Sequence, residues 1–252
     1  MILSAVHSYK GGSGKSLFSL NVANILRNNH EKRILIIESD FTMPSFQQIF
    51  VELNPDIFLN DYLNQDENPL EKYIYNTSRG FDIIFVNEAY RSKDKVHGVE
   101  ISWFLKKIGQ IREGVNSLNY DHIIFDLSPG FHLFSISIFP IIDKIFLVMR
   151  PDYQSYQGLW RLIRVVYQKA VLSEKLDCHL IFNQIPNYDL IDPVIESWIS
   201  DVLKQFTFFS SIEKIKYNDV TSYHTALRKT ILPEDDPTSQ MIAKLVKKIF
   251  LS

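Results

Sequence analysis

Short apolar runs recur along the chain and predict the strands of a sheet. The runs do not alternate with polar residues, which is typical of strands that are covered on both faces in a parallel sheet. They are ILSAV (2–6), ILII (34–37), FDIIFV (81–86), HIIFD (122–126), KIFLVM (144–149) and HLIFN (179–183).

Longer segments with helical spacing separate these runs. They predict helices over 16–28, 99–118, 155–174 and 189–206. The first of them is apolar on nearly every side, which indicates a buried helix. Strands that alternate with helices predict an α/β fold, a doubly wound and mostly parallel sheet with helices on both faces. Because no repeat or linker interrupts the pattern, we expect a single domain over 1–252.

Composition narrows the classes of function. The chain has 252 residues, of which 46% are hydrophobic, and this is enough for one sizeable core. Its 27 basic and 29 acidic residues give a net charge of −2, so no general basic field favours nucleic acid. The single Cys178 excludes an intrachain disulfide and a cysteine-built metal site. We expect a cytoplasmic protein, with a peripheral membrane location as the alternative, because no signal-peptide or membrane-spanning pattern is present.

A glycine-rich stretch, SYKGGSGKS (8–16), lies between the first strand and the first helix. It departs from the pattern G-x-x-x-x-G-K-[ST] because Tyr9 stands at the place of the first glycine. The spacing nevertheless predicts that Lys15 reaches the β and γ phosphates of a nucleotide and that Ser16 binds Mg²⁺. Glycines there let backbone N–H groups approach a phosphate at the start of a helix. The expected nucleotide-binding residues of this loop are Gly11, Gly12, Ser13, Gly14, Lys15 and Ser16.

Acidic residues end two of the predicted strands. Asp126 can hold Mg²⁺ through a water molecule, the alternative being that it caps the next helix. Glu38 and Asp40 lie two residues apart on an extended chain, so both can face the nucleotide. Asp40, in the loop beyond the strand, is the better candidate to orient the attacking water. For Glu38 the alternative is that it is solvated or that it caps the following segment, TMPSF (42–46).

Asn183 ends the last predicted strand. Its amide offers one donor and one acceptor, the pair that matches the N6 and N7 edge of adenine. The adjacent NQIP contains no carboxylate for the donors of guanine, which favours ATP over GTP. The alternative is an ordinary turn residue. Since ligands of such sheets bind at the carboxyl ends of the strands, we expect Asn183 on the same edge as Asp40, Asp126 and the glycine-rich loop.

In sequence the chain resembles the MinD/ParA ATPases, whose deviant Walker A motif is KGGxGK[ST]. The resemblance runs over nearly the whole chain, and the first motif is the most specific. The deviant loop is matched by KGGSGKS (10–16), switch I by ILIIESDFTMPS (34–45), and switch II by YDHIIFDLSPG (120–130). The adenine strand of the family is similar to HLIFNQI (179–185), and its closing segment is similar to 225–249. In the family a proline of this closing segment, here Pro233, lies against the base.

This resemblance implies a function for the second lysine, Lys10. In the family ATP is held between two subunits, and the lysine at this place reaches the phosphates of the other subunit. The implied activity is slow ATP hydrolysis by an ATP-dependent homodimer with an activating protein partner, acting as a spatial positioning or partitioning switch. The implied catalytic residues are Lys10, Lys15 and Asp40, with Asp126 on the magnesium side.

Two departures from the family keep an alternative open. Glu38 stands where the family usually has aspartate, and the proline of DLSPG (126–130) is one position later than in the commonest form. The alternative is an ATP-binding adaptor that hydrolyses poorly and recruits a protein partner. A small-molecule kinase is a third hypothesis, but the chain shows no cluster of arginines typical of a lid.

Three surface features leave the partners open. MinD proteins end in a basic amphipathic helix on the membrane, whereas we expect the apolar stripe of 241–249 to pack on the sheet. Basic residues suggest DNA only weakly, because charges on exposed helices usually face water. DNA and membrane surfaces are therefore the weaker alternatives. The basic candidates are Arg91, Lys93, Lys95, Lys106, Lys107 and Arg112; the aromatic residues Phe41, Phe46 and Phe50 are either partner contacts or core.

Overall fold

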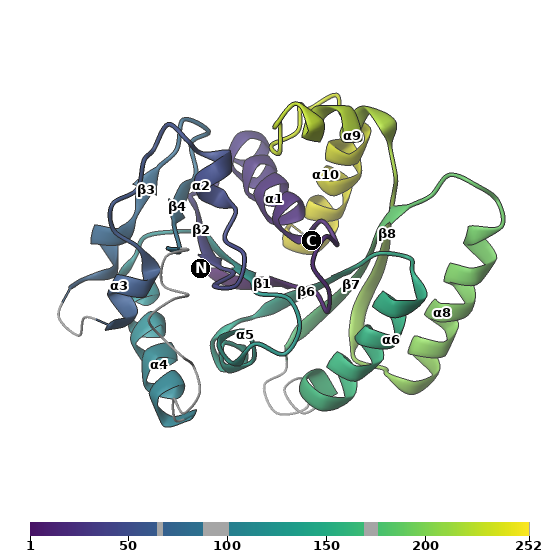
Figure 1. The fold of residues 1–252 in the computed structure, drawn as a ribbon, viewed down its shortest axis with the longest axis horizontal. Helices are drawn as coiled ribbons and strands as arrows, with labels where there is room; N and C mark the ends of the chain where they lie inside the picture. The colour runs from purple at the N-terminus through teal and green to yellow at the C-terminus, as the bar shows by residue number, and fades with distance from the viewer. Residues whose placement is uncertain (65–67, 88–100, 169–175, 252) are drawn as a thin grey trace.

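The computed structural model describes residues 1–64, 68–87, 101–168 and 176–251, and within them eight strands form one sheet (Figure 1). The strand order is β3-β4-β2-β5-β1-β6-β7-β8, and each neighbouring pair is parallel except β3 and β4. The strands are β1 (Ile2–His7), β2 (Ile34–Ser39), β3 (Tyr75–Asn76), β4 (Asp82–Ile84), β5 (His122–Leu127), β6 (Lys144–Met149), β7 (Asp177–Ile185) and β8 (Phe209–Lys216).

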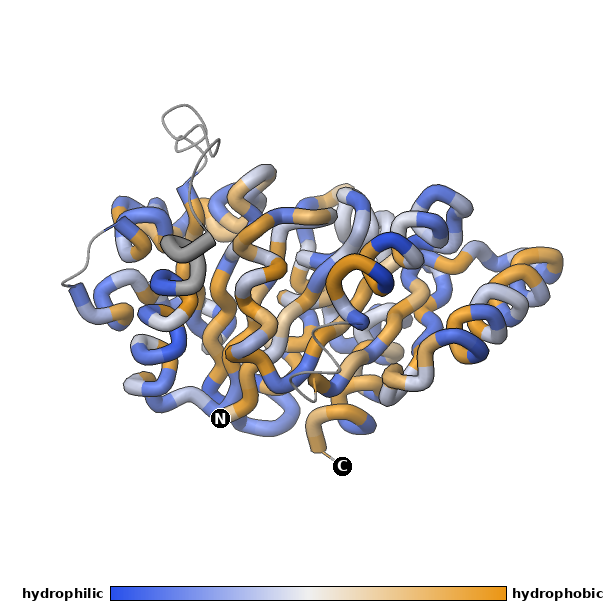
Figure 2. Tube along the Cα trace, turned by 90° about the horizontal axis from the view of Figure 1, so that it is seen from below, coloured by the Kyte–Doolittle hydropathy of each residue, from blue (hydrophilic) through white to orange (hydrophobic). Residues whose placement is uncertain are grey.

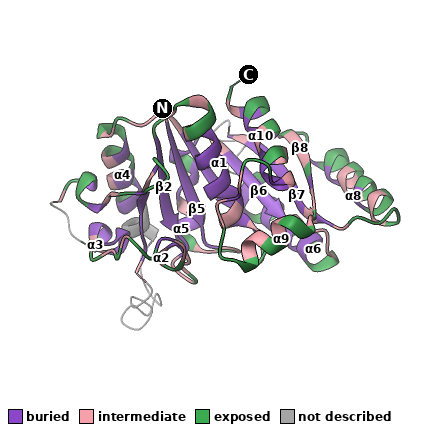
Figure 3. Cartoon of the chain, turned by 90° about the horizontal axis from the view of Figure 1, so that it is seen from above, coloured by how far each residue is buried: buried purple, intermediate pink, exposed green. Residues whose placement is uncertain are grey.

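Helices cover both faces of the sheet. One face carries α1 and α10, and the other carries α4, α5, α6 and α8 (Figures 1 and 3). The helices are α1 (Lys15–His30), α2 (Phe46–Ile49), α3 (Leu59–Asn64), η1 (Leu70–Tyr73), α4 (Ile101–Ser117), α5 (Leu133–Ser137), η3 (Phe139–Ile141), α6 (Tyr153–Leu162), η4 (Ile163–Tyr167), α8 (Ile191–Gln205), α9 (Asp219–Ala226) and α10 (Pro237–Phe250). The expected α/β fold, a mostly parallel sheet between two helical layers, is confirmed.

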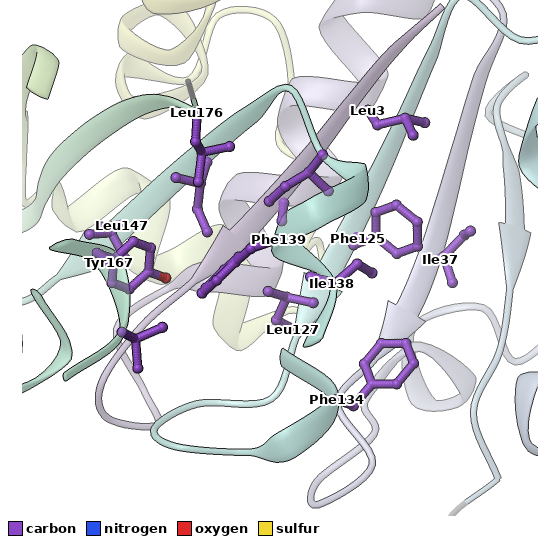
Figure 4. Packing of buried hydrophobic residues seen from close by; sticks show 14 of the residues in the cluster. Leu3, Ile37, Phe125, Leu127, Phe134, Ile138, Phe139, Leu147, Tyr167 and Leu176 are labelled. Carbon is purple, nitrogen blue, oxygen red and sulfur yellow. The ribbon is translucent and has the colours of Figure 1, made fainter. Parts of the chain in front are cut away.

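The apolar runs form strands because each supplies side chains to both layers. In β2, Leu35 and Ile37 enter the buried cluster on the α4 side, while Ile34 and Ile36 enter the cluster on the α1 side. Successive side chains of a strand point to opposite faces, so only an uninterrupted apolar run can fill both clusters. Figure 2 shows this as hydrophobic segments through the middle of the molecule, and Figure 4 shows the packing of the first cluster.

The pattern of apolar runs did not predict two of the strands. β8 lies at the edge of the sheet and reads FSSIEKIK, with Ile215 as its one buried side chain. β3 has only two residues and pairs antiparallel with β4. An edge strand is covered less, so its sequence need not be continuously apolar. The six predicted runs all lie in the sheet or directly beside its strands.

The predicted packing of the C-terminal stripe is confirmed. Ile242 and Val246 of α10 are fully buried in the cluster beneath α1, so this apolar face is not free for a membrane. Asp236 caps the helix by accepting hydrogen bonds from the N–H groups of Thr238 and Ser239. Among the described residues, no helix is both long enough and apolar enough to cross a membrane.

Two of the three aromatic residues after β2 belong to the core. Phe46 and Phe50 are buried on the α1 side, which decides between the two readings of these residues. Phe41 is half-buried and packs against Phe134 and His132, with ring centroids 5.0 and 6.1 Å away.

Candidate nucleotide-binding site

The glycine-rich loop turns tightly between β1 and α1. Gly12 and Gly14 have φ angles of 77° and 87°, in the left-handed region that favours glycine. A Cβ on Gly14 would also lie 2.3 Å from Nδ2 of Asn183. Glycine at this position is therefore required both by the backbone conformation and by the close approach of β7.

Lys15 lies at the centre of a buried charge cluster. Its Nζ is 3.2 Å from Oδ1 of Asp126 and 3.7 Å from Oδ2 of Asp40. Ser16 donates a hydrogen bond to Oδ2 of Asp126 at 2.6 Å, and Ser19 donates to Oδ1 at 2.9 Å. Three of these residues, Lys15, Asp40 and Asp126, are at most 8% exposed. The expected convergence of loop and strand ends is therefore present, and Ser19 is an additional member that the motif did not indicate.

Asp40 is held as an anion at the end of β2. Burial alone would raise its pKa, but the charge of Lys15 and hydrogen bonds from Thr42 and Met43 outweigh burial and lower the pKa. Oδ1 accepts from the N–H groups of Thr42 and Met43 at 3.1 and 3.0 Å, and from the Thr42 hydroxyl at 2.6 Å. The carboxylate is thus ionised at neutral pH, and its second oxygen, Oδ2, faces Lys15.

Glu38 does not share the orientation of Asp40. It is fully buried, and its two oxygens accept from the backbone N–H groups of Ser45 (2.7 Å), Phe46 (2.9 Å) and Val86 (3.1 Å). Burial raises its pKa to about 7, against these hydrogen bonds and with a contribution from Asp126. The interpretation that both acids face the nucleotide is wrong for Glu38, because its carboxylate instead holds the loop before α2. The alternative of a cap on 42–46 is correct.

Asn183 contacts the glycine-rich loop itself. Its Nδ2 donates to the carbonyl of Ser13 at 2.8 Å, and the residue is 5% exposed. The next residue, Gln184, has a φ of 59°, and the pairing of β7 with β8 is irregular beside it. Backbone strain of this kind is concentrated at functional sites. The role of Asn183 in binding adenine stays a prediction.

Pro233 lies in a loop that is tied to α1. Asn21 donates to the carbonyl of Thr230 at 2.9 Å and accepts from the N–H of Leu232 at 2.8 Å. Its contact with a base stays a prediction, but Asn21 fixes the loop to the helix that begins at the phosphate loop. Sequence reasoning missed Asn21. The signal that could have found it is a polar residue in a helix that is expected to be buried, because a buried polar group needs a hydrogen-bond partner.

Lys10 is on the surface and contacts α6. Its Nζ donates to Oε1 of Gln154 at 2.6 Å. Tyr9 lies against the same helix, since a Cβ on Gly158 would come within 1.8 Å of the Tyr9 ring. The departure at position 9 therefore has a structural partner: the tyrosine ring occupies the space that Gly158 leaves in α6.

The other basic candidates differ in their exposure. Lys107 is buried, while Lys106 and Arg112 are exposed on α4. Arg91, Lys93 and Lys95 lie outside the described residues. No continuous basic surface for DNA follows from the residues that the structure describes.

The cluster fits a magnesium-bound nucleotide chemically. The Ser16 hydroxyl and the Asp126 carboxylate are oxygen donors, which Mg²⁺ prefers, and they lie together beneath the loop. Ser13 is buried with no hydrogen-bond partner for its hydroxyl within the described ranges. Lys15 carries a charge that can neutralise phosphate.

The chain is similar to known proteins over most of its length. A family model described as an AAA domain (AAA_31) matches residues 1–178, which is well over half of the chain. The virulence plasmid ParA family protein pGP5-D of Chlamydia psittaci is 24% identical over 219 residues, covering 85% of this chain and 76% of that protein. The chain belongs to the MinD/ParA family. Members of this family are P-loop ATPases.

Solved structures show the MinD/ParA fold over almost the entire chain. A plasmid partition protein of Borrelia burgdorferi B31 bound to AMPPNP has a TM-score of 0.75 and 18% identity, covering 99% of this chain and 98% of that one. The septum site-determining protein MinD of Pyrococcus horikoshii, complexed with Mg-ADP, has a TM-score of 0.71 and 18% identity, covering 98% and 95%.

Proposed function

We propose that this MinD/ParA protein binds Mg-ATP, dimerises around it and hydrolyses it slowly as a positioning or partitioning switch. The observation that carries the proposal is the buried cluster of Lys15, Asp126, Ser16 and Asp40 beneath the glycine-rich loop. The nucleotide complexes of the B. burgdorferi and P. horikoshii proteins support it.

Each member of the cluster has a distinct role in this proposal. Lys15 binds the phosphates. Ser16 and Asp126 would hold Mg²⁺, which would supply positive charge against the phosphates. Asp40 orients the attacking water, because it is anionic and its Oδ1 is fixed by three hydrogen bonds. The chain thus supplies position and charge rather than a covalent intermediate.

Lys10 completes the site across the dimer interface. It is exposed, and its bond to Gln154 is a surface contact, which contributes little to stability. Release from Gln154 frees the ammonium for the phosphates of a second subunit, where it supplies charge as an arginine finger does. An activating protein partner would then control when this closed state forms.

Two substitutions test the enzyme proposal. Asp40→Ala is expected to lower the rate of phosphate release about 100-fold or more while ATP binding remains. Lys10→Ala is expected to abolish the ATP-dependent doubling of mass in size-exclusion chromatography and to lower turnover. Asp61→Ala, on α3, is a matched control, since it removes an aspartate whose Oδ2 accepts from a single local N–H. An unchanged mass with ATP in the wild type would eliminate the dimer.

The adaptor alternative has lost one of its two motives. Glu38 binds backbone N–H groups and does not belong to the charge cluster around Lys15. The glutamate at the place of the usual aspartate is therefore no reason to expect weak hydrolysis. Turnover at saturating ATP that depends on Asp40 would reject the adaptor. Nucleotide binding without measurable turnover, in the wild type and Asp40→Ala alike, would support it.

A further inference from the structure

His7, at the end of β1, is a buried titratable residue that the proposed hydrolysis does not use. The side chain is fully buried. Its Nδ1 lies 2.5 Å from the hydroxyl of Tyr167, and its Nε2 lies 2.9 Å from the carbonyl oxygen of Gly130. The residue therefore joins the loop after β5 to the end of η4, two segments that are separated in sequence.

The positions of the protons follow from the partners. A carbonyl oxygen can only accept, so Nε2 of His7 carries a hydrogen and donates to Gly130. In a neutral ring Nδ1 is then an acceptor, and Tyr167 must donate to it. Burial lowers the pKa of His7 to about 4 and raises that of Tyr167, so both groups stay neutral. The bonds form a directed chain from tyrosine through histidine to the turn.

The turn at Gly130 is fixed on both of its polar atoms. Its N–H donates to the carbonyl of Ser8 at 2.8 Å, and its carbonyl accepts from His7. Gly130 has a φ of 77°, so the turn has a conformation that few other residues adopt. His7 and Ser8, at the end of β1, thereby hold the switch II turn against the start of the phosphate loop.

The partner of His7 lies in an unusual helix. Residues Ile163–Tyr167 form one π-helical turn that continues α6, and such turns are rare and frequently occur at functional sites. Tyr167 lies among the apolar side chains of the α4-side cluster, to which Leu147 also belongs (Figure 4). Its hydroxyl has the Nδ1 of His7 as partner, so the π-turn delivers the phenol group to this nitrogen.

Tyr9 makes a second link between the same segments. Tyr9 lies two residues beyond His7, and it packs against the same buried cluster that contains Tyr167. Its ring contacts Phe131 edge-on, with centroids 6.1 Å apart, and packs over Gly158 of α6. Switch II and the α6–η4 helix are therefore joined at two points through the junction of β1 and the phosphate loop.

We propose that His7 and Tyr167 are positioning residues that hold the switch II turn at Gly130 for hydrolysis and link its movement to η4. The inference rests on the proposed ATPase function, since the turn follows the strand that ends in Asp126. In this proposal both residues act through the position of Gly130.

Tyr167→Phe tests the pair, because it removes only the hydroxyl that binds Nδ1. We expect kcat for ATP to fall about tenfold while KM stays within about twofold of wild type. Tyr62→Phe is the matched control: Tyr62 is also buried, and its hydroxyl donates to the backbone oxygen of Gln110, away from the loop. Equal kcat values for the two variants would overturn the proposal.

Nitrogen NMR of the histidines provides a readout that does not depend on turnover. In the nucleotide-free wild type, His7 should be the Nε2–H tautomer with a strongly hydrogen-bonded Nδ1, and Tyr167→Phe should shift the Nδ1 signal. The Nδ1–H tautomer would overturn the proposal. Tyr62→Phe should leave this signal unchanged.

The same experiments separate this inference from the proposed function. If the wild type binds Mg-AMPPNP but releases no phosphate from ATP, the enzyme proposal fails. The NMR signals of His7 then test the inference by themselves: a shift on adding Mg-AMPPNP supports the link to switch II, and no shift overturns it. If the wild type binds no nucleotide, both proposals fall. If it hydrolyses ATP and Tyr167→Phe behaves as Tyr62→Phe does, only the inference falls.

Discussion

Single side chains near the phosphate loop differ in charge state because their partners differ. Glu38 and Asp40 are two residues apart, yet burial raises the pKa of Glu38 to about 7, whereas Lys15 and nearby donors lower that of Asp40. Glu38 has backbone N–H partners only, and dipoles compensate burial less than a full charge does. The type of a side chain is thus a weaker guide to its role than the groups that surround it.

The pH dependence of stability should reveal the buried His7. Its folded pKa of about 4 lies below the ordinary value of 6.5, so the unfolded chain takes up the proton first as the pH falls. The stability that neutral His7 contributes is complete above about pH 6.5 and is lost toward pH 4, by on the order of 3 kcal/mol.

The measurement compares urea unfolding of the wild type and His7→Gln between pH 4 and pH 8. Glu38 acts in the opposite sense, because its raised pKa makes stability fall as the pH rises from about 4.5 to 7. Its contribution is present in both proteins and cancels in their difference. A difference that stays constant with pH would show that His7 does not titrate as described.

The sequence predicted the residues whose position follows from strand ends. Lys15, Ser16, Asp40 and Asp126 could be placed together because parallel strands bring their carboxyl ends to one edge. Glu38 could not, since its partners come from two separate segments, the loop before α2 and the chain after β4, whose paths no periodicity specifies. The contact of His7 with Tyr167 likewise depends on a π-turn without a sequence signal.

Among the elements, α6 has a close steric match to the phosphate loop. A Cβ on Gly158 would lie 1.8 Å from Cδ1 and 2.3 Å from Cε1 and Cγ of Tyr9, so any larger residue must displace the ring. Glycine within a helix is ordinarily unfavourable. Its presence in α6 therefore reflects the tyrosine at the place of the usual loop glycine, and the two departures from the expected pattern explain each other.

Gly158→Ala should destabilise the protein by about 1–3 kcal/mol, because the added methyl overlaps the Tyr9 ring. Gly109→Ala, in α4, is the matched control: no atom lies within 4 Å of its added Cβ, so it should stabilise by up to about 1 kcal/mol. Chemical denaturation measures both. Tyr9→Ala should relieve the cost of Gly158→Ala, and independent, additive effects in the double variant would contradict the steric account.

At the scale of the whole molecule, the sheet separates two buried clusters, and α10 closes one of them. Ile242 and Val246 lie under α1, and Lys248 forms an ion pair with Glu213 of β8 across the edge. The helix therefore joins the first helix to the last strand of the sheet (Figure 1). The buried apolar side chains of α10 have partners within the fold, so this apolar face is not available to lipid while the helix is packed.

Ile242→Ala should lower the free energy of unfolding by about 2–5 kcal/mol, the usual cost of truncating a fully buried side chain. Leu251→Ala is the control, because Leu251 is 39% exposed and should cost much less. Urea unfolding gives both values. The wild type should also fail to sediment with vesicles of anionic lipid, and sedimentation that depends on Ile242 would show that α10 leaves the fold.

The tie between Asn21 and the loop at Thr230 and Leu232 has a consequence for biosynthesis. The phosphate loop is translated first, but β1 gains both of its sheet neighbours only after residue 149, and α1 meets this loop only after residue 232. On the ribosome, β1 and α1 therefore cannot complete their packing until the later strands and this loop have been made. We expect tight capture of nucleotide only after residue 232 has been made, because Asn21 ties the loop at Thr230 and Leu232 to the helix that begins at the phosphate loop.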